Sequence, residues 1–337
     1  MGWWQVSADT LAGSRFVISP LAEATASLVA LGRAAPAHPA ERDWLSAHQP
    51  AYEALLAADP VTAALVNAGL GRRWTADLFT QPPAGEGEAT FDEELALVRD
   101  LPAEAVLADL AVALDGPVPP LLRRRDLTER ACGLLQWTWE QAVLPTWPHR
   151  RRILEADIVA RTALLARGGW TAALAGIRPG MRWLGEGRLQ INALDRPPGD
   201  VTGGRLFFVP VTQRGGWVSW TAPPERPLGG SPPRSPAAPH RYAVMYECNG
   251  TLAAGPARVP ETLSALLGPA RAQVLVLLGT PKSTTQLVAL TGLALGSVGR
   301  HVRVLHQAGL LGRSRAGRSV LYFRTPAADS LVAAQER

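Results

Sequence analysis

The sequence has 337 residues, of which 47% are apolar and 19% are charged. This length suits two or three domains, and so many apolar residues can fill a core, so neither a single small module nor a disordered chain is expected. The isolated Cys132 and Cys248 exclude a disulfide scaffold and a cysteine-based zinc module. Without a transmembrane stretch or an export signal at residues 1–15, a cytoplasmic location away from membranes is expected.

The charge is unevenly distributed along the chain. Residues 260–337 carry nine basic and three acidic side chains, whereas residues 1–259 carry 25 basic and 26 acidic side chains. The formal net charge of +5 therefore comes from the C-terminal part. A basic segment attached to a near-neutral body is typical of a protein that binds a polyanion.

The first half of the chain predicts helices. Ser19 can cap a helix and Pro20 suits its first position, and the stripe that follows repeats every three or four residues. That stripe consists of Leu21, Ala24, Leu28 and Leu31. Further helical patterns occupy residues 41–58, 60–69, 104–114, 127–143 and 150–167. These patterns predict a helical module at residues 1–180.

The pattern changes near Gly180. Residues 189–193 alternate between apolar and polar, and three short segments rich in aromatic and β-branched residues follow, which indicates strands. These segments are residues 206–211, 217–220 and 242–246. The proline-rich residues 222–241 lack apolar periodicity and predict a loop or linker. Residues 181–259 are therefore expected to form a β-containing extension.

Four short helical patterns follow residue 260. They occupy residues 261–267, 269–278, 285–291 and 297–308. Ser283 or Thr284 can cap the third, and a turn at residues 292–295 separates it from the fourth, which Gly309 ends. Val298, Val302 and Leu305 give the fourth helix one apolar face.

Two alternating segments complete the pattern. Residues 310–315 and 318–324 flank the turn Ala316-Gly317, which predicts a β-hairpin. Helix, turn, helix and hairpin in this order predict a winged helix-turn-helix at residues 260–337. The expected fold class is therefore α+β and mainly helical, with an N-terminal helical module, a small β extension and this C-terminal domain.

The predicted domain carries donors where duplex DNA would lie. The second helix of a helix-turn-helix enters the major groove, where arginine and serine can bond bases and phosphates. The candidates on this helix are Ser297, Arg300, His301 and Arg303. On the hairpin, Arg313, Arg315 and Arg318 are expected to contact the neighbouring backbone or minor groove.

At these residues the sequence resembles the ArsR-type winged-helix repressors of bacteria. The resemblance rests on Gly292-Leu293, residues 298–305, Ala308-Gly309-Leu310 and residues 315–322. It implies a homodimeric regulator of transcription that binds operator DNA. Residues 19–23 and 204–210 resemble a domain of unknown function found ahead of such winged helices. Neither resemblance supplies an effector.

Three features depart from the family pattern. Ala294 stands where a small polar cap is usual, and Gly296 and Gly299 stand where polar residues commonly face the groove. The cysteine pair with which many relatives bind metals is missing, and the helix concerned begins with Thr284-Thr285. Neither a metal nor a cofactor is expected.

Several residues have a structural interpretation beside a functional one. His301 could contact DNA or pack against the hairpin, whereas His306 is expected to face solvent. The basic run at residues 150–152 is more often a solvated face than a DNA contact. The tryptophan pairs 137/139 and 217/220 could line a ligand pocket, although core packing is the commoner role. Cys132 is expected to be inert packing.

The expected function is a homodimeric repressor that binds inverted-repeat operators, with the N-terminal module sensing an unknown non-metal effector, a small molecule or a partner. Apolar dimer contacts are predicted at the ends of the C-terminal domain, from Leu263, Leu266, Leu267, Leu331 and Val332. The alternatives are an architectural DNA-binding protein without a sensor and an enzyme with an unrecognised site. The chain lacks nucleophile-elbow, Walker, zinc-protease and dinucleotide motifs, so no enzymatic activity is expected.

Overall fold

The computed structural model describes most of the chain. The described residues are 2–36, 39–71, 74–85, 87–192, 199–221, 240–248, 259–279, 282–316 and 319–335. The chain divides into two compact units. Unit 1 comprises Met1–Thr146 and Arg161–Glu247, and unit 2 comprises Trp147–Ala160 and Cys248–Arg337. Within the described residues, no helix is long and apolar enough to cross a membrane.

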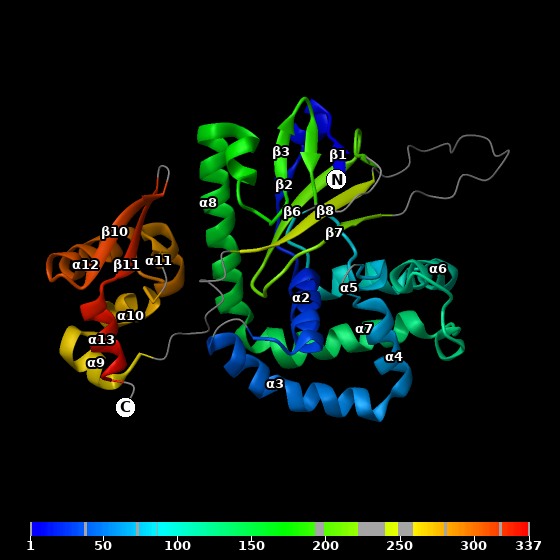
Figure 1. The fold of residues 1–337 in the computed structure, drawn as a ribbon, viewed down its shortest axis with the longest axis horizontal. Helices are drawn as coiled ribbons and strands as arrows, with labels where there is room; N and C mark the ends of the chain where they lie inside the picture. The colour runs from blue at the N-terminus through cyan, green and yellow to red at the C-terminus, as the bar shows by residue number, and fades with distance from the viewer. Residues whose placement is uncertain are drawn as a thin grey trace. The chain divides into compact units, whose positions relative to one another are not determined.

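The structure is an α+β fold in which helices predominate, as predicted (Figure 1). The helices that begin in unit 1 are α1 (Ala8–Ala12), α2 (Pro20–Arg33), α3 (Pro39–Ala58), α4 (Pro60–Gly69), α5 (Phe91–Arg99), α6 (Ala103–Leu114) and α7 (Leu127–Thr138). They confirm the predicted helices between residues 20 and 138. The pattern predicted for residues 127–143 continues beyond α7 as a π-helical segment, Trp139–Val143.

Helix α8 (Trp147–Leu174) is longer than the predicted helix at residues 150–167. Its backbone departs from helical geometry at Gly168 and Gly169, so two helical segments meet there. Helix α5 was missing from the predicted elements. The local signal for it is the capping box formed by Thr90 and Glu93, whose side chains bond each other's backbone N–H.

Helix α2 begins as its sequence predicts. The Ser19 hydroxyl accepts a hydrogen bond from the Ala22 N–H at 2.9 Å, and Pro20 occupies the first turn. The Ser19 hydroxyl also donates to the Glu94 carboxylate at 2.8 Å, and the Leu21 N–H donates to the same oxygen at 2.9 Å. The Glu94 carboxyl group of α5 therefore bonds to the start of α2.

Two faces of α2 are buried. The predicted stripe of Leu21, Ala24, Leu28 and Leu31 packs into the helical core with α3, α4, α5, α6 and α7. On another face, Ala22 and Ala26 pack against apolar side chains of a sheet. One helix thus joins the helical core of unit 1 to its β-structure (Figure 1).

The described residues of unit 1 form two four-stranded sheets. One has the strand order β3 (Arg182–Gly185), β4 (Arg188–Gln190), β1 (Trp3–Gln5) and β5 (Gly199–Asp200). The other has the order β2 (Arg15–Phe16), β6 (Arg205–Val211), β8 (Arg241–Glu247) and β7 (Val218–Trp220). In the second sheet β2, β6 and β8 are parallel, whereas β7 is antiparallel to β8.

Strand β6 is buried on both faces. Leu206 and Phe208 pack with the side chains around Trp4, and Phe207 and Val209 pack with those of α2. A strand covered on both sides reads as a continuous apolar run, which explains why residues 206–211 predicted a strand without clear alternation.

The predicted boundary at residue 180 lies inside unit 1. Strands β1 and β2 come from the first 16 residues, yet β1 pairs with β4 and β2 pairs with β6. Most of the predicted helical module and the strands of the β extension therefore share unit 1, whereas residues 147–160 of the predicted module belong to unit 2. Sequence periodicity could not reveal this, because strands of two or three residues give almost no periodic signal. Residues 222–239 of the predicted proline-rich loop lie outside the described residues.

Unit 2 contains the four predicted C-terminal helices and the two predicted strands. They are α9 (Glu261–Leu267), α10 (Pro269–Leu277), α11 (Thr284–Thr291), α12 (Leu295–Gln307), β10 (Leu311–Ala316) and β11 (Ser319–Arg324). The unit also contains the short strand β9 (Lys282–Ser283), which was not predicted, and α13 (Pro326–Ala333). Strands β10 and β11 form the predicted antiparallel hairpin, and β11 also pairs with β9. The predicted helices and hairpin are confirmed to within two residues at their ends.

The ends of α11 follow from local chemistry. Ser283 caps the helix in a reciprocal box with Gln286, and Gly292 ends it with φ of +70°. Lys282, the only lysine of the sequence, is 2% exposed, and its Nζ donates to the Leu277 carbonyl at the end of α10 at 2.6 Å. Burial, together with the nearby Arg324 charge, lowers the pKa of Lys282 to about 8.

Candidate functional site

Helix α12 has one buried and one exposed face. Val298, Val302 and Leu305 are buried in unit 2, as predicted. Arg300 and Arg303 lie on the opposite face and are exposed. Neither guanidinium forms a hydrogen bond or ion pair in the part of the chain that the structure describes. Both side chains are therefore available to an external ligand.

The remaining predicted residues of α12 lie at the border of this face. Ser297 and His301 are half-buried, because they stand beside the buried positions rather than opposite them. Sequence reasoning missed Gln307, an exposed residue four positions after Arg303 on the same face. The spacing of Arg300, Arg303 and Gln307 by three and four positions places them on one helix face, and this spacing could have identified Gln307 from the sequence.

The hairpin residues are described in part. Arg313 on β10 is exposed and pairs in register with Tyr322 of β11. The side chain of Arg315 and the whole of Arg318 lie outside the described residues.

The positions at which α12 departs from the family pattern are Ala294, Gly296 and Gly299. Ala294 occupies the cap position and makes no side-chain hydrogen bond to the helix. A β-carbon at Gly296 or Gly299 would meet no atom within 4 Å. Packing within the described residues therefore does not require glycine at either position.

The structure also describes the basic run at residues 150–152 and the residues predicted as dimer contacts. Arg150 is buried, which differs from the solvated face expected for the basic run, whereas Arg151 is half-buried and donates to Glu155 at 2.9 Å, and Arg152 is exposed. Of the predicted dimer contacts, Leu263 and Val332 are buried inside unit 2, because they pack into its own core. Leu266 is 64% exposed.

Unit 1 contains a cavity of about 690 Å³. Much of its wall is aromatic, although polar groups also line it. The aromatic residues are Trp3, Trp4, Trp74, Trp217, Trp220 and Tyr242. Two pairs among them meet edge to face, Trp4 with Tyr242 at 5.6 Å and Trp74 with Trp220 at 5.7 Å between ring centroids. These contacts hold the walls in fixed orientations.

The two tryptophan pairs considered in the sequence analysis lie in different surroundings. Trp217 and Trp220 line the cavity. Trp139 instead stacks on Phe91 at 4.8 Å, and Trp137 lies against Tyr52, both next to the helical core. Cys132 is buried in that core, and burial raises the pKa of its thiol.

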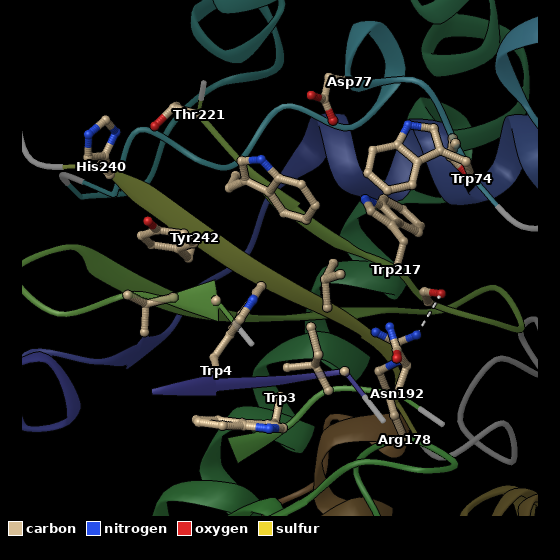
Figure 2. Close-up of a pocket in the computed structure, with 18 of the residues that line it drawn as sticks. Trp3, Trp4, Trp74, Asp77, Arg178, Asn192, Trp217, Thr221, His240 and Tyr242 are labelled. Atoms are coloured by element: carbon tan, nitrogen blue, oxygen red, sulfur yellow. Dashed lines mark hydrogen bonds between the residues drawn. The ribbon is translucent and has the colours of Figure 1, made fainter. Parts of the chain in front are cut away.

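Arg178 is a half-buried cation of the cavity wall. Its Nη2 donates to the Gly216 carbonyl at 3.3 Å (Figure 2), and its Nη1 is buried with no hydrogen-bond partner among the residues that the structure describes. Burial lowers the pKa of this guanidinium from its usual value. In Figure 2, Asn192 lies near Arg178, whereas Thr221 and His240 lie at the far end of the tryptophan-lined space.

Asp77 is the partly buried acid of the wall. Burial raises the pKa of its carboxyl to about 7, and the nearby Asp109 carboxylate adds to the rise. Asp109 accepts hydrogen bonds from the Asp77 N–H and from the Trp74 indole N–H, the latter at 3.3 Å. Asp109 thereby holds the loop of Trp74 and Asp77 against α6.

No group of three or more His, Cys, Asp and Glu side chains that could hold a metal ion is found among the described residues. Searches with this chain against family models, curated proteins and solved structures each returned no match.

Proposed function

We propose that residues 260–337 form a winged helix-turn-helix that binds duplex operator DNA as a homodimer, and that the chain regulates transcription as a repressor. In this proposal α11 and α12 are the two helices of the motif and the β10–β11 hairpin is the wing. Helix α12 enters the major groove with Arg300 and Arg303 toward the bases and phosphates.

The exposed face of α12 carries this proposal. Arg300 and Arg303 stand opposite the buried Val298 and Val302, and neither is neutralised by an acidic partner in the described part of the chain. Exposed arginines without carboxylate partners suit an anionic ligand, and a guanidinium bonds guanine or phosphate through two N–H groups at once. The net positive charge of residues 260–337 supports the same ligand.

The sequence resemblance to ArsR-type repressors supports the homodimer in this proposal. Leu266, exposed on α9, is an apolar residue that a second copy could cover. An isologous interface would place two α12 helices about one turn of DNA apart.

The test begins with selection of bound duplexes from a random library by the full chain, followed by titration at several salt concentrations. We expect enrichment of an inverted repeat. Arg300→Ala should weaken binding to that repeat by about 1 to 3 kcal/mol. Arg303→Ala should weaken binding to repeat and scrambled duplex alike if it contacts phosphate, with the salt slope reduced by about one.

Arg125→Ala, at an exposed arginine of unit 1, is the matched control and should bind DNA as the unchanged chain does. If no sequence is enriched but all duplexes bind alike, the architectural alternative replaces the repressor. If Arg300→Ala and Arg303→Ala bind every duplex as tightly as Arg125→Ala, α12 is not the DNA-contacting helix.

A further inference from the structure

The aromatic cavity of unit 1 is large enough to hold a ligand. Its volume of about 690 Å³ lies within the range of small-molecule sites, roughly 300 to 1,000 Å³. Five of the eleven tryptophans of the sequence line it, together with Tyr242. Rigid indole faces and edges favour planar, aromatic ligands over flexible polar ones.

The positive charge of Arg178 in the cavity wall favours a negatively charged ligand. Arg178 makes one hydrogen bond to a backbone carbonyl, and no carboxylate of the described residues pairs with it. Burying Nη1 of this half-buried guanidinium without an anion is costly, because the lost hydration of that atom is not replaced. A ligand carboxylate beside Arg178 would remove this cost and would gain charge-assisted hydrogen bonds.

The acidic residues of the wall do not reverse this preference for a negatively charged ligand. The pKa of Asp77 is raised to about 7, so its carboxyl is partly neutral at neutral pH. Asp200, at the end of β5, is exposed and accepts a hydrogen bond from the Thr202 N–H at 2.9 Å. A second cation, the exposed Arg33, also lines the cavity. Aromatic cages commonly bind cations, but Arg178 would repel one here.

We propose that this cavity binds a small planar aromatic acid, with its carboxylate beside Arg178 and its rings between the tryptophan side chains. The nearby Asn192 amide lies where it can help to orient the carboxylate (Figure 2). This binding does not depend on the proposed DNA function, because it involves residues of unit 1 alone.

The experiment is calorimetric titration of the full chain with benzoate, 2-naphthoate and 2-anthroate, each beside its primary amide and its aminomethyl analogue. At least one acid should bind at least about tenfold more tightly than its amide, and the amine should bind most weakly. The amide keeps the rings and the shape, so the difference isolates the negative charge.

Variants then locate the charge. Arg178→Gln should weaken binding of the best acid by about tenfold or more and bring it to the level of the amide, whereas Arg178→Lys should keep part of the preference. Trp220→Leu should weaken acid and amide together. Arg42→Gln, at an exposed arginine away from the cavity, is the control and should leave both affinities unchanged.

Two outcomes overturn the proposal. One is that no acid binds more tightly than its amide at concentrations up to about 1 mM. The other is that Arg178→Gln, shown to be folded by circular dichroism, binds the acid as Arg42→Gln does. If Arg178→Gln does not fold, the comparison of acid, amide and amine on the unchanged chain decides alone.

Discussion

Glu94 is a buried carboxyl that supports the start of another helix. It is 1% exposed and accepts hydrogen bonds from the Ser19 hydroxyl and the Leu21 N–H through one oxygen. Its other oxygen is buried without a hydrogen-bond partner in the described part of the chain. Burial raises the pKa of Glu94 to about 7, although both hydrogen bonds lower it.

This pKa makes the stability of unit 1 depend on pH. The folded state holds the proton more tightly than the unfolded chain, so the contribution of Glu94 is full below about pH 4.5 and is lost as the pH rises through 7. Glu94→Gln cannot ionise. Its free energy of unfolding relative to the unchanged chain should therefore increase between pH 4.5 and 7, by on the order of 3 kcal/mol.

Urea unfolding at several pH values, followed by tryptophan fluorescence, measures this difference. Glu104→Gln removes an exposed carboxylate from a helix of the same unit and is the control. A constant difference between Glu94→Gln and the unchanged chain over this pH range would show that Glu94 stays ionised in the folded protein.

The residues of this cap show how far sequence reasoning reaches at this scale. Ser19 and Pro20 predicted the start of α2 because capping is decided within four residues. Glu94 was not predicted as their partner, because it lies 75 positions after Ser19 and no local pattern links them. Arg178 was missed for the same reason, since its cavity is assembled from distant segments.

Helix α12 contains glycines at helical positions that its packing leaves open. Gly299 lies inside the helix, and a β-carbon there would meet no atom within 4 Å. Glycine costs roughly 0.5 to 1 kcal/mol relative to alanine at such a position. Gly299→Ala should therefore stabilise unit 2 by that amount, which calorimetric melting can measure.

Gly292→Ala, at the end of the preceding helix, should have the opposite effect on stability. Gly292 ends α11 with φ of +70°, where an alanine is strained by roughly 1 to 2 kcal/mol. We expect this variant to melt at a lower temperature than the unchanged chain. If Gly299→Ala is also destabilised, α12 does not form a regular helix around that residue.

Elements that depend on local sequence signals were predicted, whereas strands that depend on distant pairing partners were missed. The helices of unit 2 and the β10–β11 hairpin follow from caps, glycine stops and alternation, all of which act over a few residues. Strands β1 and β2 were missed because each has only two or three residues and is stabilised by partners near positions 190 and 207.

The same limit explains the domain boundary. The sequence separates a helical half from a β-rich part near residue 180, and this change of pattern is real. The boundary nevertheless lies inside unit 1, because α2 packs against both the helices and the sheet. Composition identifies the kinds of element, whereas long-range packing decides which of them share a core.

The two units carry different natural probes. Ten of the eleven tryptophans lie in the ranges of unit 1, and the only lysine lies in unit 2. Tryptophan fluorescence therefore reports mainly on unit 1, and a chemical reaction of the lysine reports on unit 2.

The buried amine of Lys282 makes unit 2 a reporter of its own opening. An acylating reagent must reach this Nζ, which is shielded from water and bonded to the Leu277 carbonyl. In the folded protein Lys282 should be acylated at least about 100-fold more slowly than a free lysine peptide, because modification requires the unit to open. Peptide mapping by mass spectrometry over a range of urea concentrations gives the rate. A native rate equal to that of the peptide would contradict the buried position, whereas a graded rise with urea would measure how often the C-terminal unit unfolds while the tryptophan signal stays native.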